Sequence, residues 1–302
     1  MQPKIQETTK IVDARLEAAM AGQYSFSMNS IFDEAWAKTK GFKSIYWGAV
    51  GVVVLMALAF FILTAMIVGA VGMSTGGIVG EQLHLVTPLE KWLEIPMPMF
   101  LTLLILTLIA LFIFLPLMAG LWMMSITHVT GRPVYFKMLF SYFKKPVRYW
   151  LTYLWTTVLM QIGNTVGGPV ARYFAVFGGV AVYWLCVALS VVIQIYVLVS
   201  YFFALPLIAD RNLGAWRALE VSRKAVGRHW FKVFGTLLMI VLVSVFIPGF
   251  VIGLLFGVVH WSLLVFGIIF VWLVPFYALC TAILYREIFG VMSVPNTIQP
   301  SL

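Results

Sequence analysis

Residues 45–72 read IYWGAVGVVVLMALAFFILTAMIVGAVG and contain no acidic, basic or histidine side chain. Because an α-helix needs about 20 apolar residues to cross a bilayer, this stretch predicts a transmembrane helix. The whole chain is 62% hydrophobic and 10% charged with a mean hydropathy of +1.00, outside the range of water-soluble domains. We predict an all-α polytopic membrane protein with six transmembrane helices, the other five at about 97–125, 149–167, 176–208, 231–258 and 262–285.

The basic residues lie mainly on one side of these predicted helices. Eighteen of the twenty Lys and Arg residues fall in the termini or in alternate loops, and only Lys91 and Arg172 lie on the opposite side. By the positive-inside rule, this asymmetry places both termini in the cytoplasm. The net charge of +9 is distributed along the ends of the spans and is not gathered on one reading element, so we expect no nucleic-acid binding.

A short amphipathic stretch precedes each odd-numbered span, at residues 27–43, 135–145 and 212–228. In the first stretch, the residues that follow the helical period and share one face are Met28, Ile31, Phe32, Ala35, Trp36 and Thr39. The faces expected in the other two stretches are Phe136, Leu139, Phe140 and Phe143, and then Ala215, Ala218, Leu219, Ser222 and Val226.

The even-numbered spans carry Pro116, Pro206 and Pro275, and each proline predicts a kink because it removes a backbone hydrogen bond. The six spans therefore form three pseudo-repeats of an interfacial amphipathic helix plus a helix pair. Residues 163–169 read GNTVGGP and predict a turn between the third and fourth spans.

Basic residues and tryptophans at these helix ends are typical of interfacial helices that bind anionic lipid. An alternative is that the amphipathic helices only pack under the bundle and follow the topology rule. The predicted lipid-interface residues are Lys40, Lys43, Trp47, Lys144, Lys145, Arg148, Trp150, Arg223, Lys224, Arg228 and Trp230.

Three regions are expected: a cytoplasmic tail over 1–26, a six-helix membrane domain over 27–290 and a cytoplasmic tail over 291–302. Val12, Leu16 and Ala19 suggest a short helix in the first tail that docks on the cytoplasmic face. In the fifth span, Gly249, Gly253 and Gly257 share one helix face and predict close helix packing, either within one chain or between two protomers. The oligomeric state stays open.

Reactive groups do not cluster in the sequence. No histidine pair has metal-ligand spacing, and no nucleophile elbow or phosphate-binding loop occurs. Asp210 is expected to cap the helix that follows it. Gln161 and Gln194, which lie within spans, are expected to hydrogen-bond between helices or to line a polar groove. We predict no catalytic residue, no cofactor and no metal site.

Three segments resemble the YciC-like family of bacterial inner-membrane proteins. They are IFDEAW at 31–36 followed by Lys40 and Gly41, FALPLIAD at 203–210 followed by ALEVSRKAV at 218–226, and TAILYRE at 281–287. A related module is the membrane domain attached to some glycerophosphodiester phosphodiesterases. The resemblance covers most of residues 27–290 and implies a six-helix protein of the bacterial inner membrane with largely unassigned function. It transfers no active site, because this chain carries no hydrolase domain.

From these patterns we expect a non-enzymatic inner-membrane scaffold or accessory subunit that engages anionic lipid through its basic interfacial helices. Its expected partners are membrane lipids, with another membrane protein left open and nucleic acid excluded. The alternative is a transporter or channel for a lipid or other amphiphile. That function predicts a groove lined by Gln161, Gln194 and the helices kinked at the three prolines.

Overall fold

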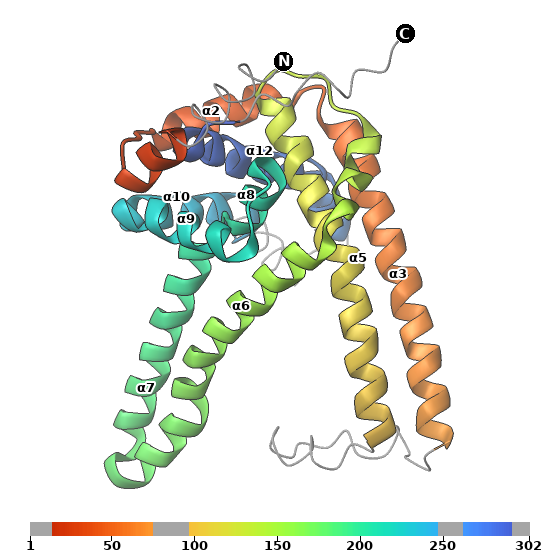
Figure 1. Cartoon of the computed structure of the whole chain (residues 1–302), viewed down its shortest axis with the longest axis vertical. Coiled ribbons are helices and arrows are strands. Elements are labelled where there is room, and N and C mark those ends of the chain that lie inside the picture. Colours follow the sequence, from red (N-terminus) through yellow and green to blue (C-terminus); the bar gives the residue numbers. More distant parts are fainter. Residues whose placement is uncertain (1–13, 75–96, 247–261, 292–302) are drawn as a thin grey trace.

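The structure, a computed structural model, describes residues 14–74, 97–246 and 262–291, and every regular element in this part of the chain is helical (Figure 1). The all-α class is therefore confirmed. Residues 14–21 are helical. The elements that follow are α2 (Met28–Thr39), α3 (Lys43–Ser74), α5 (Met97–Val129), η1 (Phe136–Lys144), α6 (Pro146–Thr165), η2 (Val166–Val170), α7 (Ala171–Tyr201), α8 (Ala204–Arg211), α9 (Ala215–Arg228), α10 (Trp230–Val241), η3 (Leu242–Phe246) and α12 (Ser262–Phe289).

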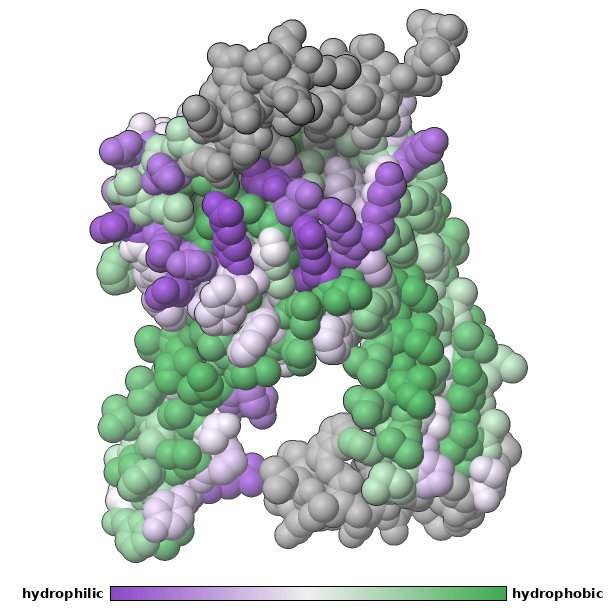
Figure 2. Space-filling model, in the orientation of Figure 1, coloured by the Kyte–Doolittle hydropathy of each residue, from purple (hydrophilic) through white to green (hydrophobic). Residues whose placement is uncertain are grey.

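These helices form two regions, which we call the head and the arms. The head contains residues 14–21, α2, η1, α8, α9, α10 and α12. The arms are two antiparallel pairs, α3 with α5 and α6 with α7, which leave the head in the same direction and diverge (Figure 1). Figure 2 shows apolar residues covering the arms and polar residues gathered on the head.

The arms expose most of their apolar side chains, except in the part of α5 from Pro116 to Val129, which is largely buried. The Trp272–Phe289 part of α12, in contrast, buries its own. Only 6% of the most apolar stretch of Lys43–Gly72 is buried, compared with 67% of Trp272–Phe289. An apolar surface as long as that of α3 is stable only in a hydrocarbon environment. The long exposed helices therefore indicate a multi-pass membrane protein.

The α6–α7 pair reverses direction at Gly179 and not at the predicted turn. Residues 163–169 are helical, and Gly179 has φ 67° and ψ −164°, a conformation almost confined to glycine. A Cβ at Gly163 would lie 2.9 Å from Cγ of Gln194, and one at Gly167 would lie 2.6 Å from Oγ of Ser190. The prediction of a turn at 163–169 was wrong because these glycines allow two helices to pack closely.

The predicted six spans in three pseudo-repeats are not confirmed. Among the described residues, four segments are long and apolar enough to cross a membrane, or five if α9 and the helix after it form one span bent by 97°. One of the four, Pro146–Arg211, includes the α6–α7 pair and so supplies two arms. Two units have the predicted order of a short helix and an arm pair. The glycines predicted for the fifth span, Gly249, Gly253 and Gly257, lie outside the described residues.

The amphipathic stretches pack largely as their periodicity predicts. Ile31, Ala35 and Thr39 are the buried residues of α2, whereas Trp36, predicted for the same face, is exposed. The buried face of α9 includes Ala218, Leu219, Ser222 and Val226. The second stretch differs because η1 is a 3₁₀ helix with about three residues per turn, which splits a face predicted for an α-helix. Leu139 is buried there, while Phe136 and Phe140 are exposed.

The three prolines predicted to kink the even-numbered spans are all buried. Pro206 lies in the first turn of α8. The helix is interrupted just before it, between Tyr201 and Ala204, as the prediction of a kink requires. Pro116 and Pro275 lie inside α5 and α12. Because the prolines are buried, they pack within the protein.

A buried polar network joins α8 to the end of α12. The Tyr285 hydroxyl donates to Asp210 Oδ2 at 2.8 Å, and Arg211 Nε lies 3.1 Å from the same oxygen. Arg211 also donates to the carbonyl oxygens of Phe289 and Gly290. The prediction that Asp210 caps α9 was wrong, because the cap position is Gly214 and Asp210 faces Tyr285.

The N-terminal segment docks on the head. Leu16 and Ala19 are almost fully buried, and the Tyr24 hydroxyl donates to the Ala225 carbonyl oxygen at 2.9 Å. Arg228 Nε donates to the Met20 carbonyl oxygen at 3.2 Å. The predicted short helix therefore packs against α9, which carries the third set of basic residues.

Candidate functional site

Positive charge is concentrated on the head. Seventeen of the twenty Lys and Arg residues are described, the others being Lys4, Lys10 and Lys91. Sixteen of the seventeen lie on head elements, in their connections or in the first turn of an arm, and Arg172 alone lies near the Gly179 turn at the far end. The described residues thus carry the charge asymmetry that the sequence predicts.

Several predicted lipid contacts bind protein groups. Lys145 Nζ donates to Asn212 Oδ1 at 2.8 Å, and Arg148 donates to both the carbonyl and the side-chain oxygen of Asn212 at 2.9 Å. Asn212 adopts a left-handed conformation with φ 55° between α8 and α9. These bonds join the second basic stretch to the third, so part of the predicted lipid interface is also a tertiary joint.

Three more predicted cations have protein partners. Lys43 Nζ lies 2.7 Å from the centre of the Trp272 ring, a cation–π contact between α3 and α12. Lys224 forms an ion pair of 2.6 Å with Glu220, one turn away on α9. Arg228 binds the Met20 carbonyl oxygen, as described above.

The three predicted interface tryptophans are half-buried. Trp150 stacks on Phe112 of α5 at 5.9 Å, and Trp230 stacks on Phe234 at 5.1 Å. The Trp230 indole nitrogen is buried and has no hydrogen-bond partner among the described residues. Trp47 lies in the first turns of α3. Contacts within the protein account for the partial burial of the Trp150 and Trp230 rings. Contact of these tryptophans with lipid headgroups stays a prediction.

Lys40, Lys144 and Arg223 remain exposed and form no hydrogen bond or ion pair within the described part of the chain. Lys40 follows the end of α2, and Lys144 ends η1. Arg223 differs from both because it lies on the wall of a pocket. It is therefore the predicted residue whose surroundings are most like a binding site.

That pocket has a volume of about 300 Å³ and lies where α9 crosses the α6–α7 pair. We call it the α9 pocket. Its walls come from α6, from α7 and from successive turns of α9. They comprise Trp155 and Leu159 of α6, Tyr201 of α7, and Trp216, Leu219, Glu220 and Arg223 of α9.

The α9 pocket combines aromatic walls with a guanidinium group. The Trp155 and Trp216 rings meet edge to face at 5.4 Å, and both side chains are well exposed, at 43% and 65%. Trp and Tyr favour the boundary between hydrocarbon and water because their rings are apolar while their N–H and O–H groups are polar. A pocket with this lining suits a ligand that is apolar at one end and anionic at the other.

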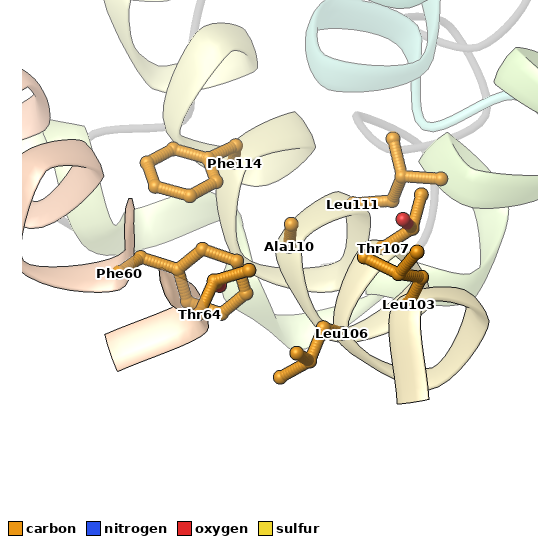
Figure 3. Close-up of a pocket in the computed structure, with 8 residues that line it drawn as sticks. All are labelled: Phe60, Thr64, Leu103, Leu106, Thr107, Ala110, Leu111 and Phe114. Carbon is orange, nitrogen blue, oxygen red and sulfur yellow. The ribbon is translucent and has the colours of Figure 1, made fainter. Parts of the chain in front are cut away.

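A second pocket lies between the arms α3 and α5 and has a volume of about 230 Å³ (Figure 3). Phe60 and Thr64 of α3 face Leu106, Ala110 and Phe114 of α5 across it, and the Phe60 and Phe114 rings are 6.1 Å apart. Hydroxyl groups are its only polar side-chain groups. Such a lining suits a hydrocarbon chain and offers no group for a charged ligand.

The side chains of Gln161 and Gln194 each form a hydrogen bond within their own helix. Gln194 donates to Ser190 Oγ on its own helix at 3.0 Å, and Gln161 accepts from Asn164 on its own helix at 3.2 Å. Each of these hydrogen bonds stays within one arm, so the expected bond between helices is not observed for these two pairs.

Sequence reasoning missed Trp155, Tyr201 and Trp216 as parts of one pocket. A signal was present at Trp216, an aromatic residue that stands outside the apolar face of a basic amphipathic helix. Its neighbours Trp155 and Tyr201 are too distant in sequence for any local pattern to connect them.

Among the described residues, no group of three or more His, Cys, Asp or Glu side chains could hold a metal ion. Comparisons with protein-family models, with curated proteins and with solved structures find no match for this chain. The resemblance to the YciC-like family therefore stays a prediction.

Proposed function

We propose that this protein is a non-enzymatic scaffold or accessory subunit of the bacterial inner membrane that engages anionic lipid headgroups with its head. The observation that carries this proposal is the position of the cations. Sixteen of the described Lys and Arg residues surround the end at which the exposed apolar arms meet the polar head. In a bilayer this boundary lies at headgroup depth, where each cation near an anionic surface gains about 1 kcal/mol.

The exposed face of η1 supports the same function. Tyr135, Phe136 and Phe140 are exposed there beside Lys137 and Lys144. Exposed aromatic rings next to lysines are typical of segments that insert into the headgroup layer and hold anionic lipid. The positive-inside rule then places the head, and with it both termini, on the cytoplasmic side.

The experiment reconstitutes the full chain in nanodiscs with equal amounts of phosphatidylglycerol and phosphatidylethanolamine. The lipids retained on the protein are then counted by native mass spectrometry. We expect enrichment of phosphatidylglycerol that falls as salt is raised, because salt screens exposed charges. The double variant Lys40→Gln with Lys144→Gln should retain less of the anionic lipid, while Lys40→Arg with Lys144→Arg should match the wild type. Equal retention of both lipids by the wild type would overturn the proposal.

A second candidate function is transport of a lipid or other amphiphile. It is favoured by the opening between the two arm pairs in Figure 2 and by the apolar pocket between α3 and α5. A fluorescent lipid reconstituted with the protein in vesicles tests it, since a transporter makes inner-leaflet label accessible to an external quencher. Vesicles with and without protein that quench to the same extent would remove this candidate.

A further inference from the structure

We propose that the α9 pocket binds one molecule of anionic glycerophospholipid, with the lipid phosphate on the Arg223 guanidinium. This inference rests on the proposed function and makes it specific, because it assigns one lipid to one site. The bulk of the basic head would then attract anionic lipid loosely, whereas this pocket would hold a single molecule.

Arg223 carries the recognition. It is exposed at the pocket and forms no hydrogen bond or ion pair among the described residues. Glu220 is the nearby acid, and its carboxylate is held at 2.6 Å by Lys224. A planar guanidinium donates two parallel hydrogen bonds to phosphate oxygens, which makes arginine well suited to this ligand.

The walls of the pocket favour a lipid over a soluble phosphate. Trp155 and Leu159 belong to α6, and Leu154 and Val158 beside them on the same arm are exposed. A ligand with its phosphate at Arg223 can therefore extend an acyl chain from the pocket along the apolar surface of the arm. Trp216 and Tyr201 would border the glycerol region, between the charged and apolar parts.

The surrounding charge requires an anionic ligand. Residues 132–232 contain twelve Lys and Arg residues and two acids. Without Arg172 near the far turn and the buried Asp210–Arg211 pair, this segment carries ten cations and one carboxylate, that of Glu220. A headgroup with a net negative charge is favoured in this field, and one with a compensating ammonium group gains less.

The test measures binding of phosphatidylglycerol to the full chain in detergent by native mass spectrometry, across a lipid titration. Arg223→Gln should weaken the tightest site about tenfold, since hydrogen bonds to a charged group are lost. Arg223→Lys should give an intermediate affinity, because the charge stays and the second parallel hydrogen bond does not. Lys144→Gln is the matched control, for it removes one exposed cation of the head outside the pocket and should leave the tightest site unchanged.

Two further arms identify the ligand and the site. Trp216→Leu should also weaken the tightest site, and its unfolding midpoint without lipid should match that of the wild type because Trp216 is exposed. Glycerol 3-phosphate at millimolar concentration should not displace the lipid. If it does displace it, or if Arg223→Gln weakens binding no more than Lys144→Gln, the proposal of a lipid site here is overturned. A wild type without any preference for anionic lipid would instead overturn the proposed function itself.

Discussion

The helices α3 and α12 are both long and apolar. The side chains of α3 are mostly exposed, whereas those of Trp272–Phe289 in α12 are mostly buried in the head. The buried share is 6% in Lys43–Gly72 and 67% in Trp272–Phe289. Apolar composition drives both helices out of water, but it does not decide whether lipid or protein replaces the water. The polar groups decide it: Tyr285 and Arg286 of α12 have partners on α8 and α2, at Asp210 and Glu34.

Both regions have hydroxyls that bond within their own helix, as Thr39 and Thr281 do on the head, but the head adds hydrogen bonds between distant elements. On the arms, hydroxyls such as those of Thr102 and Thr156 donate to carbonyl oxygens of their own helix, four residues earlier. On the head, Ser222 donates to the Ser200 carbonyl oxygen and joins α9 to α7. Bonds between distant elements specify one arrangement, whereas bonds within a helix do not. We therefore expect head substitutions to cost stability and equivalent arm substitutions to cost little.

The largest effect is expected from Arg211→Met in the buried head network. Arg211 pairs with Asp210 and donates to two carbonyl oxygens at the end of α12. Removing one partner of a buried ion pair costs about 3–5 kcal/mol because a buried charge loses its counter-ion. The free energy of unfolding in detergent, measured by denaturant titration, should fall by that amount. Arg172→Met, which removes an exposed cation near the Gly179 turn, should change it little, and equal losses would contradict the contrast.

A smaller loss is expected where η1 of the head packs on the part of α5 from Pro116 to Val129, which is largely buried and belongs to the head in its packing. A Cβ added at Gly120 would overlap the Leu139 carbonyl oxygen and lie 2.9 Å from Leu139 Cα. Because both are backbone atoms, an alanine fits here only if η1 moves. Gly120→Ala should lower the free energy of unfolding by about 1–3 kcal/mol, the usual cost of overpacking. A Cβ at Gly69 on α3 meets nothing within 4 Å. Gly69→Ala should therefore be neutral, and a tolerated Gly120→Ala would show that η1 is not held there.

The N-terminal segment allows a test at the level of one hydrogen bond. The Tyr24 hydroxyl donates to the Ala225 carbonyl oxygen, 201 residues away in sequence. Tyr24→Phe should cost about 1 kcal/mol, the typical net value of one hydrogen bond. Tyr153→Phe on α6 is the control, since this exposed residue makes no hydrogen bond among the described residues. If both variants unfold at the same midpoint as the wild type, this hydrogen bond does not help to hold the N-terminal segment on the head.

The sequence could predict the features that local periodicity reports directly. Ile31 and Ala35 of α2 and Leu219 of α9 are buried as the helical pattern requires, because one face of an amphipathic helix must leave water. The break before Pro206 followed equally from the chemistry of proline. The all-helical class followed from the length of the apolar runs.

The remaining features depend on partners that are distant in sequence. Glycine permits both a turn and a close helix contact, so Gly163 and Gly167 could not be distinguished from the true turn at Gly179. The burial of Trp272–Phe289 depends on Asp210 and Glu34, which no pattern within α12 reveals. The α9 pocket likewise needs three segments to meet, and only the predicted cation Arg223 could be recognised from its own surroundings.

The smallest expected effect is a pH-dependent change in the free energy of unfolding, and it concerns Glu34 of the head. Its carboxylate accepts two hydrogen bonds of 2.7 Å from Arg286 and lies 3.6 Å from Lys38. The hydrogen bond from Arg286 is the main cause that lowers the pKa of Glu34 below its ordinary value of 4.5, against an opposing effect of partial burial. A carboxyl whose pKa is lower in the folded state stabilises the fold above pH 4.5 and loses that contribution as the pH falls through its folded value.

The difference in unfolding free energy between the wild type and Glu34→Gln should thus be largest at pH 6 and shrink towards pH 3. With the side chain about 30% exposed, it should amount to about 0.5 kcal/mol. Glu17→Gln, at an exposed position, is the control and should show no such trend. The arms α3, α5, α6 and α7 contain no Asp or Glu, so mild acid can act on carboxylates only outside them. A Glu34 difference that is the same at pH 6 and pH 3 would mean that the pair with Arg286 does not hold α2 to α12, and that packing alone joins these two helices.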